Sequence, residues 1–254
     1  MSHVKCHMSN RSYMQFASPY ICNQKTKKRN NMVRKFDFWC QVANDNRRIH
    51  LYLPDNYDQS DERYAVLYMF DGHNLFFDQD ATFGKSLGLK EFLDAWWKRL
   101  IVVGIECAKE DWTRVREYCP YDVQSNYYGA IPGLGHQTFE WVAEKLKPYI
   151  DANYRTCPYR EATAIAGYSM GGMMSLYGVL KFNQVFSKAA VISPAIQPAM
   201  EQFRREIAED NLNPDTRIFF SWGSNELIEN PGLEDRYEHS IYFTPFSPAF
   251  LALL

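Results

Sequence analysis

The segment Gly167-Tyr-Ser-Met-Gly-Gly172 constrains this chain more than any other stretch. The residues before it, 161–166, form a short apolar run, and residues 173–180 are apolar at helical spacing, which predicts a strand and then a helix. A serine on a sharp strand-to-helix turn needs small residues two positions before and after it, and Gly167 and Gly171 meet that need. The pattern alone also occurs in plain Gly-rich turns, but its context predicts a nucleophile elbow at Ser169.

Charge is unevenly distributed along the 254 residues. Residues 1–35 hold eight Lys and Arg and no Asp or Glu, which leaves 20 basic against 30 acidic residues in the remainder. We expect residues 1–34 to be a basic, disordered extension and residues 35–254 to form one domain. A transit peptide, or translation from upstream of a natural start at Met32, would also explain the basic segment. The acidic balance of the domain argues against a nucleic-acid partner.

Several classes of protein are disfavoured by what the sequence lacks. Its six cysteines have no CxxC spacing, so we expect free thiols in a reducing cytoplasm, with no metal site and no cofactor. No stretch approaches the roughly 18 apolar residues of a membrane span, and residues 8–20 are too polar for the core of a signal peptide. The pattern therefore predicts a cytoplasmic protein without a membrane partner, and leaves the oligomeric state open.

Strand and helix patterns alternate along the domain. An antiparallel hairpin is expected from residues 35–42 and 48–53, with His50 pointing outward. Apolar runs predict buried strands at 64–70, 100–105, 161–166, 188–193 and 216–222, and helices at 90–98, 138–154, 173–180 and 199–209. Residues 106–135 show no period and are expected to be a long loop over the site. This order predicts a mostly parallel α/β sheet with helices on both faces.

An elbow serine needs an oxyanion hole, an acid and a base. The residue after the nucleophile supplies one amide, which predicts Met170, and the turn after an earlier strand supplies the other, which predicts the amide of His73. Glu226 follows the strand expected at 216–222 and is the predicted acid, although an ordinary loop glutamate is the alternative. These residues are expected to serve an ester of a small molecule.

The base is the difficult residue. Downstream of Glu226 the only histidine is His239, and the 13-residue separation leaves no room for a strand and a helix between them. His239 is the candidate base, and a surface histidine in a loose tail is the alternative. Loss of a triad base costs several powers of ten in turnover.

Four motifs in the same order resemble the putative esterase family of the α/β-hydrolase superfamily, which contains enterochelin esterases, esterase D and feruloyl esterases. They are Tyr64-Ala-Val-Leu-Tyr-Met-Phe-Asp-Gly-His-Asn-Leu-Phe76, Arg116-Glu-Tyr118, Lys147-Pro-Tyr-Ile-Asp151 with Tyr154-Arg-Thr156, and Ile165-Ala-Gly-Tyr-Ser-Met-Gly-Gly172. The resemblance implies an α/β-hydrolase fold, Ser169 as nucleophile, the amides of His73 and Met170 as oxyanion hole and Glu226 as acid. Within these motifs, we expect Asp71, Gly72, Arg116 and Tyr168 to contact the substrate.

The chain departs from that family after Glu226. Members usually continue with a helix, a strand and a His-Asn-Glu type segment, which is missing here. One possibility is that His239 acts as the base from an unusual position. The other is that the sequence is truncated or frame-shifted, in which case the base is absent and the sheet is incomplete at its C-terminal side. The expected activity is therefore a serine esterase of small acyl, carbohydrate or siderophore-type esters, and the alternative is a catalytically impaired or non-enzymatic homologue. A lipase is a further alternative, although the sequence shows no amphipathic lid helix. An acyl transferase is another.

Overall fold

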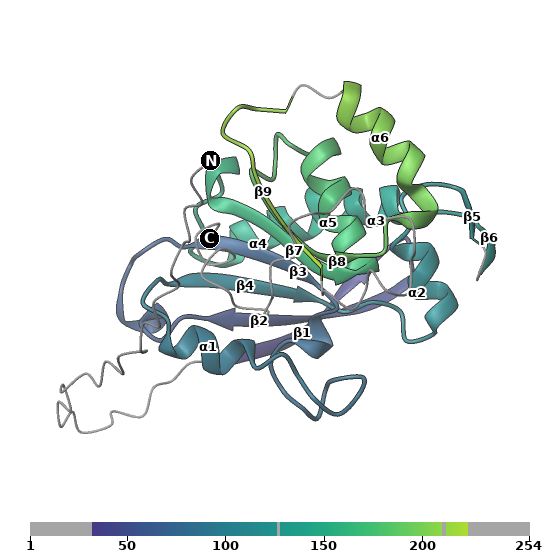
Figure 1. Ribbon diagram of the computed structural model, residues 1–254. Coiled ribbons are helices and arrows are strands. Elements are labelled where there is room, and N and C mark those ends of the chain that lie inside the picture. Colours follow the sequence, from purple (N-terminus) through teal and green to yellow (C-terminus); the bar gives the residue numbers. More distant parts are fainter. Residues whose placement is uncertain (1–31, 126–127, 210–211, 223–254) are drawn as a thin grey trace, which may run out of the picture.

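The computed structural model describes residues 32–125, 128–209 and 212–222. Seven strands form one sheet in the order β1-β2-β4-β3-β7-β8-β9, and two short strands form a separate hairpin (Figure 1). The strands are β1 Met32–Cys40, β2 Asp45–Leu53, β3 Ala65–Phe70, β4 Leu100–Ile105, β5 Val123–Ser125, β6 Gly129–Ile131, β7 Thr163–Ser169, β8 Lys188–Pro194 and β9 Arg217–Ser221. The helices are α1 Leu89–Ala95, α2 Asp111–Glu117, α3 Gly135–Trp141, α4 Lys147–Asn153, α5 Met170–Lys181 and α6 Met200–Glu209.

The sheet is parallel from β4 to β9 and antiparallel at its N-terminal side, as the strand patterns predict. β1 pairs with β2, and β2 pairs with β4, both antiparallel. β3 lies between β4 and β7, and β8 and β9 continue the parallel part. The carboxyl ends of the parallel strands therefore meet at one edge, where an open α/β sheet collects its functional groups.

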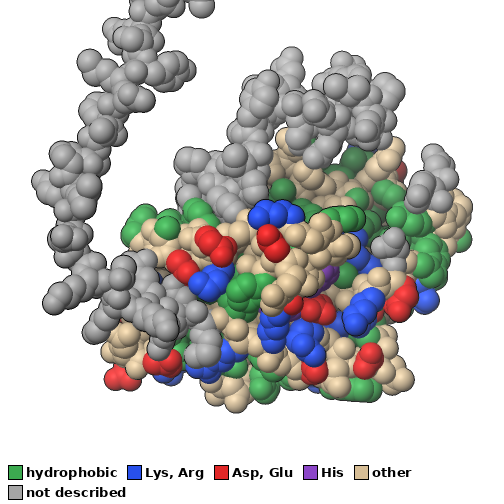
Figure 2. Space-filling view, turned by 90° about the horizontal axis from the view of Figure 1, so that it is seen from below, with side chains coloured by type: hydrophobic (Ala, Val, Ile, Leu, Met, Phe, Trp, Pro, Cys, Tyr) green, Lys and Arg blue, Asp and Glu red, His purple; other side chains and the backbone are tan. Residues whose placement is uncertain are grey.

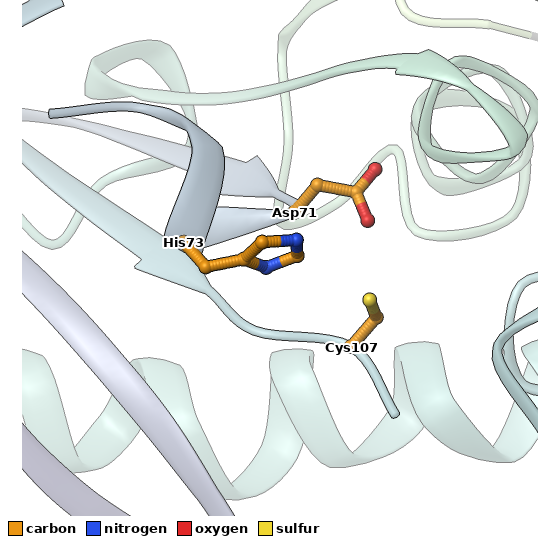
Figure 3. Close-up of side chains that lie close together, drawn as sticks. All are labelled: Asp71, His73 and Cys107. Carbon is orange, nitrogen blue, oxygen red and sulfur yellow. The ribbon is translucent and has the colours of Figure 1, made fainter. Parts of the chain in front are cut away.

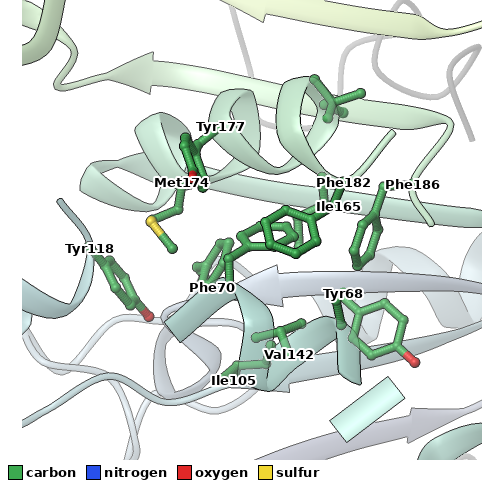
Figure 4. Packing of buried hydrophobic residues seen from close by; sticks show 14 of the residues in the cluster. Tyr68, Phe70, Ile105, Tyr118, Val142, Ile165, Met174, Tyr177, Phe182 and Phe186 are labelled. Carbon is green, nitrogen blue, oxygen red and sulfur yellow. The ribbon is translucent and has the colours of Figure 1, made fainter. Parts of the chain in front are cut away.

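Alternate residues of each central strand face two apolar layers. Val66, Tyr68 and Phe70 of β3 join the larger core, beneath α3, α4, α5 and α6, whereas Leu67 and Met69 join the smaller core beneath α1. Figure 4 shows the larger core, with aromatic rings from β3, α5 and the segment after α5 packed together. Helices thus cover both faces of the sheet, in agreement with the predicted fold class.

Three differences from the sequence expectations concern element boundaries. β1 begins at Met32, which pairs with Leu53, so the ordered strand includes residues that we assigned to the basic extension. Residues 106–135 are not a structureless loop, because they contain α2 and the β5–β6 hairpin. The helix expected from Thr138 begins at Gly135, and Thr138 instead donates its hydroxyl to the carbonyl oxygen of Leu134.

A π-helical turn, Val142–Leu146, joins α3 and α4 into one continuous rod. The Lys147 amide donates to the carbonyl of Val142, five residues earlier. Pro148 follows and has no N–H to donate to Glu144, the acceptor that an α-helix would require. The wider turn is therefore placed where the regular hydrogen-bond ladder would in any case be interrupted.

Candidate active site

Ser169 lies at the sharp turn between β7 and α5, as the motif predicts. Its backbone has φ 56° and ψ −126°, a combination that residues with side chains rarely adopt. A Cβ on Gly167 would lie 2.3 Å from the carbonyl oxygen of Gly171. The backbone therefore crosses itself too closely for any residue but glycine at position 167, which is the physical requirement behind the motif.

The elbow is packed directly against the carboxyl end of β3. A Cβ on Gly171 would lie 3.0 Å from the Cβ of Phe70 and 3.2 Å from the Oδ2 of Asp71. On the other side of Ser169, the side-chain Nδ2 of Asn74 donates to the hydroxyl of Tyr168 at 2.7 Å. The two motifs, nearly 100 residues apart in the chain, are thus brought together as the sequence predicts.

The amides proposed for the oxyanion hole come from the starts of two helical turns. Met170 is the first residue of α5, and the first amides of a helix have no intrahelical acceptor. His73 lies in a single 3₁₀ turn, Gly72–Asn74, in which the Asn74 amide already donates to the Asp71 carbonyl. A Cβ on Gly72 would lie 2.4 Å from the carbonyl carbon of Gly104, so β4 fixes this turn from below.

Asp71 is buried and paired with Arg114 of α2. Its side chain is 1% exposed, and its two oxygens accept from Nε and Nη2 of Arg114 at 2.9 and 2.8 Å. Burial alone would lower the pKa of Arg114, but the hydrogen bonds that it donates to Asp71 raise its pKa above the ordinary value. The Asp71 backbone is left-handed, with φ 58°, and its amide donates to the hydroxyl of Tyr118 at 3.3 Å. Asp71 therefore holds the turn that carries His73.

Arg114 is a site residue that sequence reasoning missed, since it selected Arg116. The guanidinium of Arg114 also lies over the ring of Tyr118, 5.1 Å from its centroid. Arg116 is partly buried, and its Nε has no hydrogen-bond partner among the described residues. The motif Arg116-Glu-Tyr118 identified the region, but it could not show that Arg114, two residues earlier, is the arginine that turns toward the carboxylate.

Figure 3 shows that the side chains of Asp71, His73 and Cys107 converge. Their ligand atoms lie within 4.8 Å of one another, the spacing of a potential metal site. However, Arg114 neutralises Asp71, and burial raises the pKa of the Cys107 thiol so that it stays protonated. A cation needs a thiolate and an uncommitted carboxylate, so this donor set suits a metal poorly.

The His73 imidazole itself is not free to accept protons readily. Its Nε2 lies 3.0 Å from the hydroxyl of Thr82. Burial lowers the pKa of His73, although the charges of Asp71 and Glu106 act in the opposite direction. The imidazole is therefore neutral at pH 7. The group of His73 that is predicted to bind the oxyanion is its backbone amide.

His50 is a correction to the sequence analysis, because it is 1% exposed rather than pointing outward. β2 is not an edge strand, since it lies between β1 and β4. The Nε2 of His50 lies 2.7 Å from Oε1 of Glu106, the residue that follows β4. Burial alone would raise the pKa of Glu106, but the hydrogen bond from His50 lowers it below its ordinary value. This pair joins two strands at the edge of the site.

Aromatic residues of the segment 106–135 divide into two groups. Tyr118 is buried, and Tyr121 packs edge-on against Tyr177 of α5, so these rings fix the segment to the core. Trp112 and Tyr128 are exposed, and their rings lie 6.2 Å apart. The segment therefore uses some of its aromatic rings to pack against the core and leaves others exposed.

The predicted acid and base, Glu226 and His239, lie outside the described residues. The described part of the chain ends at Trp222, directly after β9. Cys40, Cys107, Cys119 and Cys157 are free thiols. Among the helices described, none has both the length and the apolar character needed to cross a bilayer.

Comparison with known proteins found a matching family model and curated relatives. A family model described as "Putative esterase" matches residues 40–241. The uncharacterized protein YbbA of Bacillus subtilis (strain 168) is 27% identical over 192 residues, which cover 74% of this chain and 72% of that protein. Esterase Rv1288 of Mycobacterium tuberculosis (strain ATCC 25618 / H37Rv) is 30% identical over 145 residues, 57% of this chain and 28% of that protein.

Among solved structures, an IroE-like serine hydrolase from Shewanella oneidensis aligns with a TM-score of 0.61 at 19% identity. The alignment covers 76% of this chain and 61% of the other, so the chain spans less than two thirds of that hydrolase. Identity this low establishes the fold alone, and the fold is that of the α/β-hydrolases.

Proposed function

Because the chain belongs to the Putative esterase family, we propose that it hydrolyses carboxylic esters through an acyl-enzyme formed on Ser169. The single observation that carries the choice of nucleophile is the strained elbow, with Ser169 at φ 56° and ψ −126° between two close-packed glycines. Backbone strain of this kind is kept where the surrounding structure enforces it, and a reacting group is the usual reason.

The proposed reaction has two steps. The Oγ of Ser169 attacks the acyl carbon while a histidine takes its proton, and the amides of Met170 and His73 hold the oxyanion. The alcohol leaves after receiving that proton, and a water molecule then attacks the acyl-enzyme with the same histidine as base. The free acid leaves, and Ser169 regains its proton.

We assign the base to His239 and the acid to Glu226. The three described histidines support this by elimination, since each is already engaged: His50 with Glu106, His73 with Thr82, and His136 with Tyr177. The chain order of serine, acid and histidine is also that of the α/β-hydrolases.

The experiment is labelling with a fluorophosphonate probe together with turnover of p-nitrophenyl acetate. Ser169→Ala should abolish labelling and lower turnover by several powers of ten. Ser60→Ala, a change in a surface segment far from the elbow in the chain, is the matched control and should behave as wild type. Labelling that persists in Ser169→Ala would refute the proposal.

The second candidate is an impaired homologue that keeps the pocket and lacks a working base. The observation that favours it is the short separation of Glu226 and His239. A working imidazole gives a rate that rises through about pH 6.5, and His239→Gln should remove that limb. A rate without the limb, and unchanged in His239→Gln, would favour the second candidate.

We propose small acyl, carbohydrate or siderophore-type esters as the substrates. Trp112 and Tyr128 are exposed on the segment that follows β4, and aromatic faces of this kind suit a sugar or a phenolic group. Gly72, Arg116 and Tyr168 are the further residues proposed to contact the substrate. Because the acyl-enzyme can pass its acyl group to an alcohol as well as to water, the product ratio in methanol would separate transfer from hydrolysis.

A further inference from the structure

A pocket lies at the opposite end of the sheet from Ser169. It has a volume of about 190 Å³ and is enclosed by the end of β2, the last turn of α1 and the segment that enters β4. Its lining residues are Tyr52, Pro54, Asp55, Leu93, Asp94, Ala95, Trp96, Trp97, Lys98, Arg99 and Leu100. Pockets for drug-sized ligands usually have about 300–1,000 Å³, so this one fits a single small ring.

The strand register separates this pocket from the elbow. Ile101, beside Leu100 of the pocket, is level with Thr163 of β7 through Val66 of β3. Ser169 is six residues further along β7, which is roughly 20 Å at about 3.3 Å per residue. A ligand in the pocket would therefore not contact the proposed nucleophile.

Two adjacent tryptophans form the aromatic part of the pocket. Trp97 is 77% exposed, which is unusual for such a large apolar ring. The ammonium of Lys98 lies 5.7 Å from the ring centroid of Trp96 and 5.4 Å from that of Trp97. This cation fixes the two indoles and leaves most of the Trp97 surface open to a ligand.

The polar groups of the pocket occur in pairs of opposite charge. Arg99 donates to Asp55 at 3.1 Å. Asp94 accepts from Lys90 at 2.5 Å and from the hydroxyl of Tyr52 at 3.1 Å. Figure 2 likewise shows acidic and basic side chains interspersed on the face seen from below, without a patch of one sign. A charged ligand would have to disrupt these pairs, whereas a neutral ligand with many hydroxyls can add hydrogen bonds to them.

We propose that this pocket binds one ring of a neutral carbohydrate. A sugar ring has an apolar C–H face and, around its rim, equatorial hydroxyls. An aromatic ring matches the C–H face, and the planar carboxylate and guanidinium groups beside it match the hydroxyls. Trp97 packs against the C–H face, and Asp55, Asp94 and Arg99 bind the hydroxyls. The site is independent of the chemistry at Ser169.

The test is saturation-transfer difference NMR with cellobiose, xylobiose and N,N′-diacetylchitobiose, each at several millimolar, on the full chain carrying Ser169→Ala. Transfer to the ring protons of at least one disaccharide is expected. It should fall at least tenfold in Trp97→Ala and in part in Trp97→Phe, which keeps an aromatic face.

The matched control is Trp39→Ala, because Trp39 is also an exposed tryptophan, at 54%, but lies on β1 away from the pocket lining. This variant should retain the transfer signal. No transfer from any of the three disaccharides would overturn the proposal. Equal signals in Trp97→Ala and wild type would also overturn it.

Discussion

Helix α2 carries two buried ion pairs that have the same chemistry. They differ in the backbone segment to which the partner residue belongs. Arg114 pairs with Asp71, and three residues further on Glu117 pairs with Arg47 of β2 and accepts from the Ala108 amide. Arg47 belongs to an ordinary extended strand, whereas Asp71 has left-handed backbone and precedes the proposed oxyanion turn. We infer that one pair only holds the helix in place, while the other also holds the geometry of the site.

The largest expected contrast comes from removing one partner of each pair. Arg114→Ala and Arg47→Ala should each lower the free energy of unfolding by about 3 kcal/mol, because each leaves a buried carboxylate without its cation. Only Arg114→Ala should also slow fluorophosphonate labelling of Ser169, by about 100-fold, because the His73 amide loses its position. Urea unfolding and labelling rates below the unfolding transition measure the two effects. Equal labelling rates in the two variants would remove the distinction.

A smaller contrast is expected when the charge is kept and the planar fork is lost. Arg114→Lys can no longer bind both oxygens of Asp71, and we expect kcat to fall by about tenfold with KM unchanged. Arg47→Lys is the control and should leave both constants at their wild-type values. A rise in KM with kcat intact would instead assign Arg114 to substrate binding.

Replacing both partners tests whether the charges themselves matter. In Arg47→Met with Glu117→Gln, the neutral side chains fill the same space, and stability should change by no more than about 1 kcal/mol with activity intact. Arg114→Met with Asp71→Asn should also remain folded, since asparagine tolerates a left-handed backbone. Esterase assays should show slower turnover only in the second double variant.

The smallest effect is expected from the pair of His50 and Glu106, which joins β2 to the residue after β4. The pair of Arg47 and Glu117 joins β2 to α2 in the same way. The pKa of Glu106 is lower in the folded protein than in the unfolded chain, so its contribution to stability is present above about pH 4.3 and is lost as pH falls through the lowered value. His50→Asn removes the hydrogen bond that lowers the pKa. Melting temperatures should therefore fall less between pH 7 and pH 3 in this variant than in wild type, because Glu106 then has no lowered pKa in the folded protein.

Local patterns predicted most of the fold, because the spacing of apolar residues within a short stretch of sequence distinguishes a strand from a helix. The apolar run 100–105 coincides with β4, and the Gly-flanked serine specified β7, the elbow and α5 together. The turn at His73 was predicted from its place after the strand expected at 64–70 and from the need for a second oxyanion amide, and the resemblance agreed with it.

Contacts between distant residues could not be predicted in the same way. Arg47 and Glu117 are 70 residues apart and Asp71 and Arg114 are 43 apart, so nothing in either neighbourhood signals the pairing. α2 itself has no side-chain N-cap and depends on those contacts, which explains why its segment resembles a loop in sequence. The burial of His50 follows from the position of β2 between two other strands, which a hairpin pattern does not reveal.

The π-helical turn at Val142–Leu146 has a consequence for how this chain should be compared with its relatives. Such a turn holds one residue more than the α-helical turn it replaces. Deleting a residue from a regular α-helix would rotate everything after it by about 100°, whereas here the wider turn takes up the extra residue and its deletion would leave the face of α4 unchanged. Alignments across this point should therefore be allowed a one-residue gap inside the helix, and a relative without the extra residue should still present the equivalent face of α4 to the sheet.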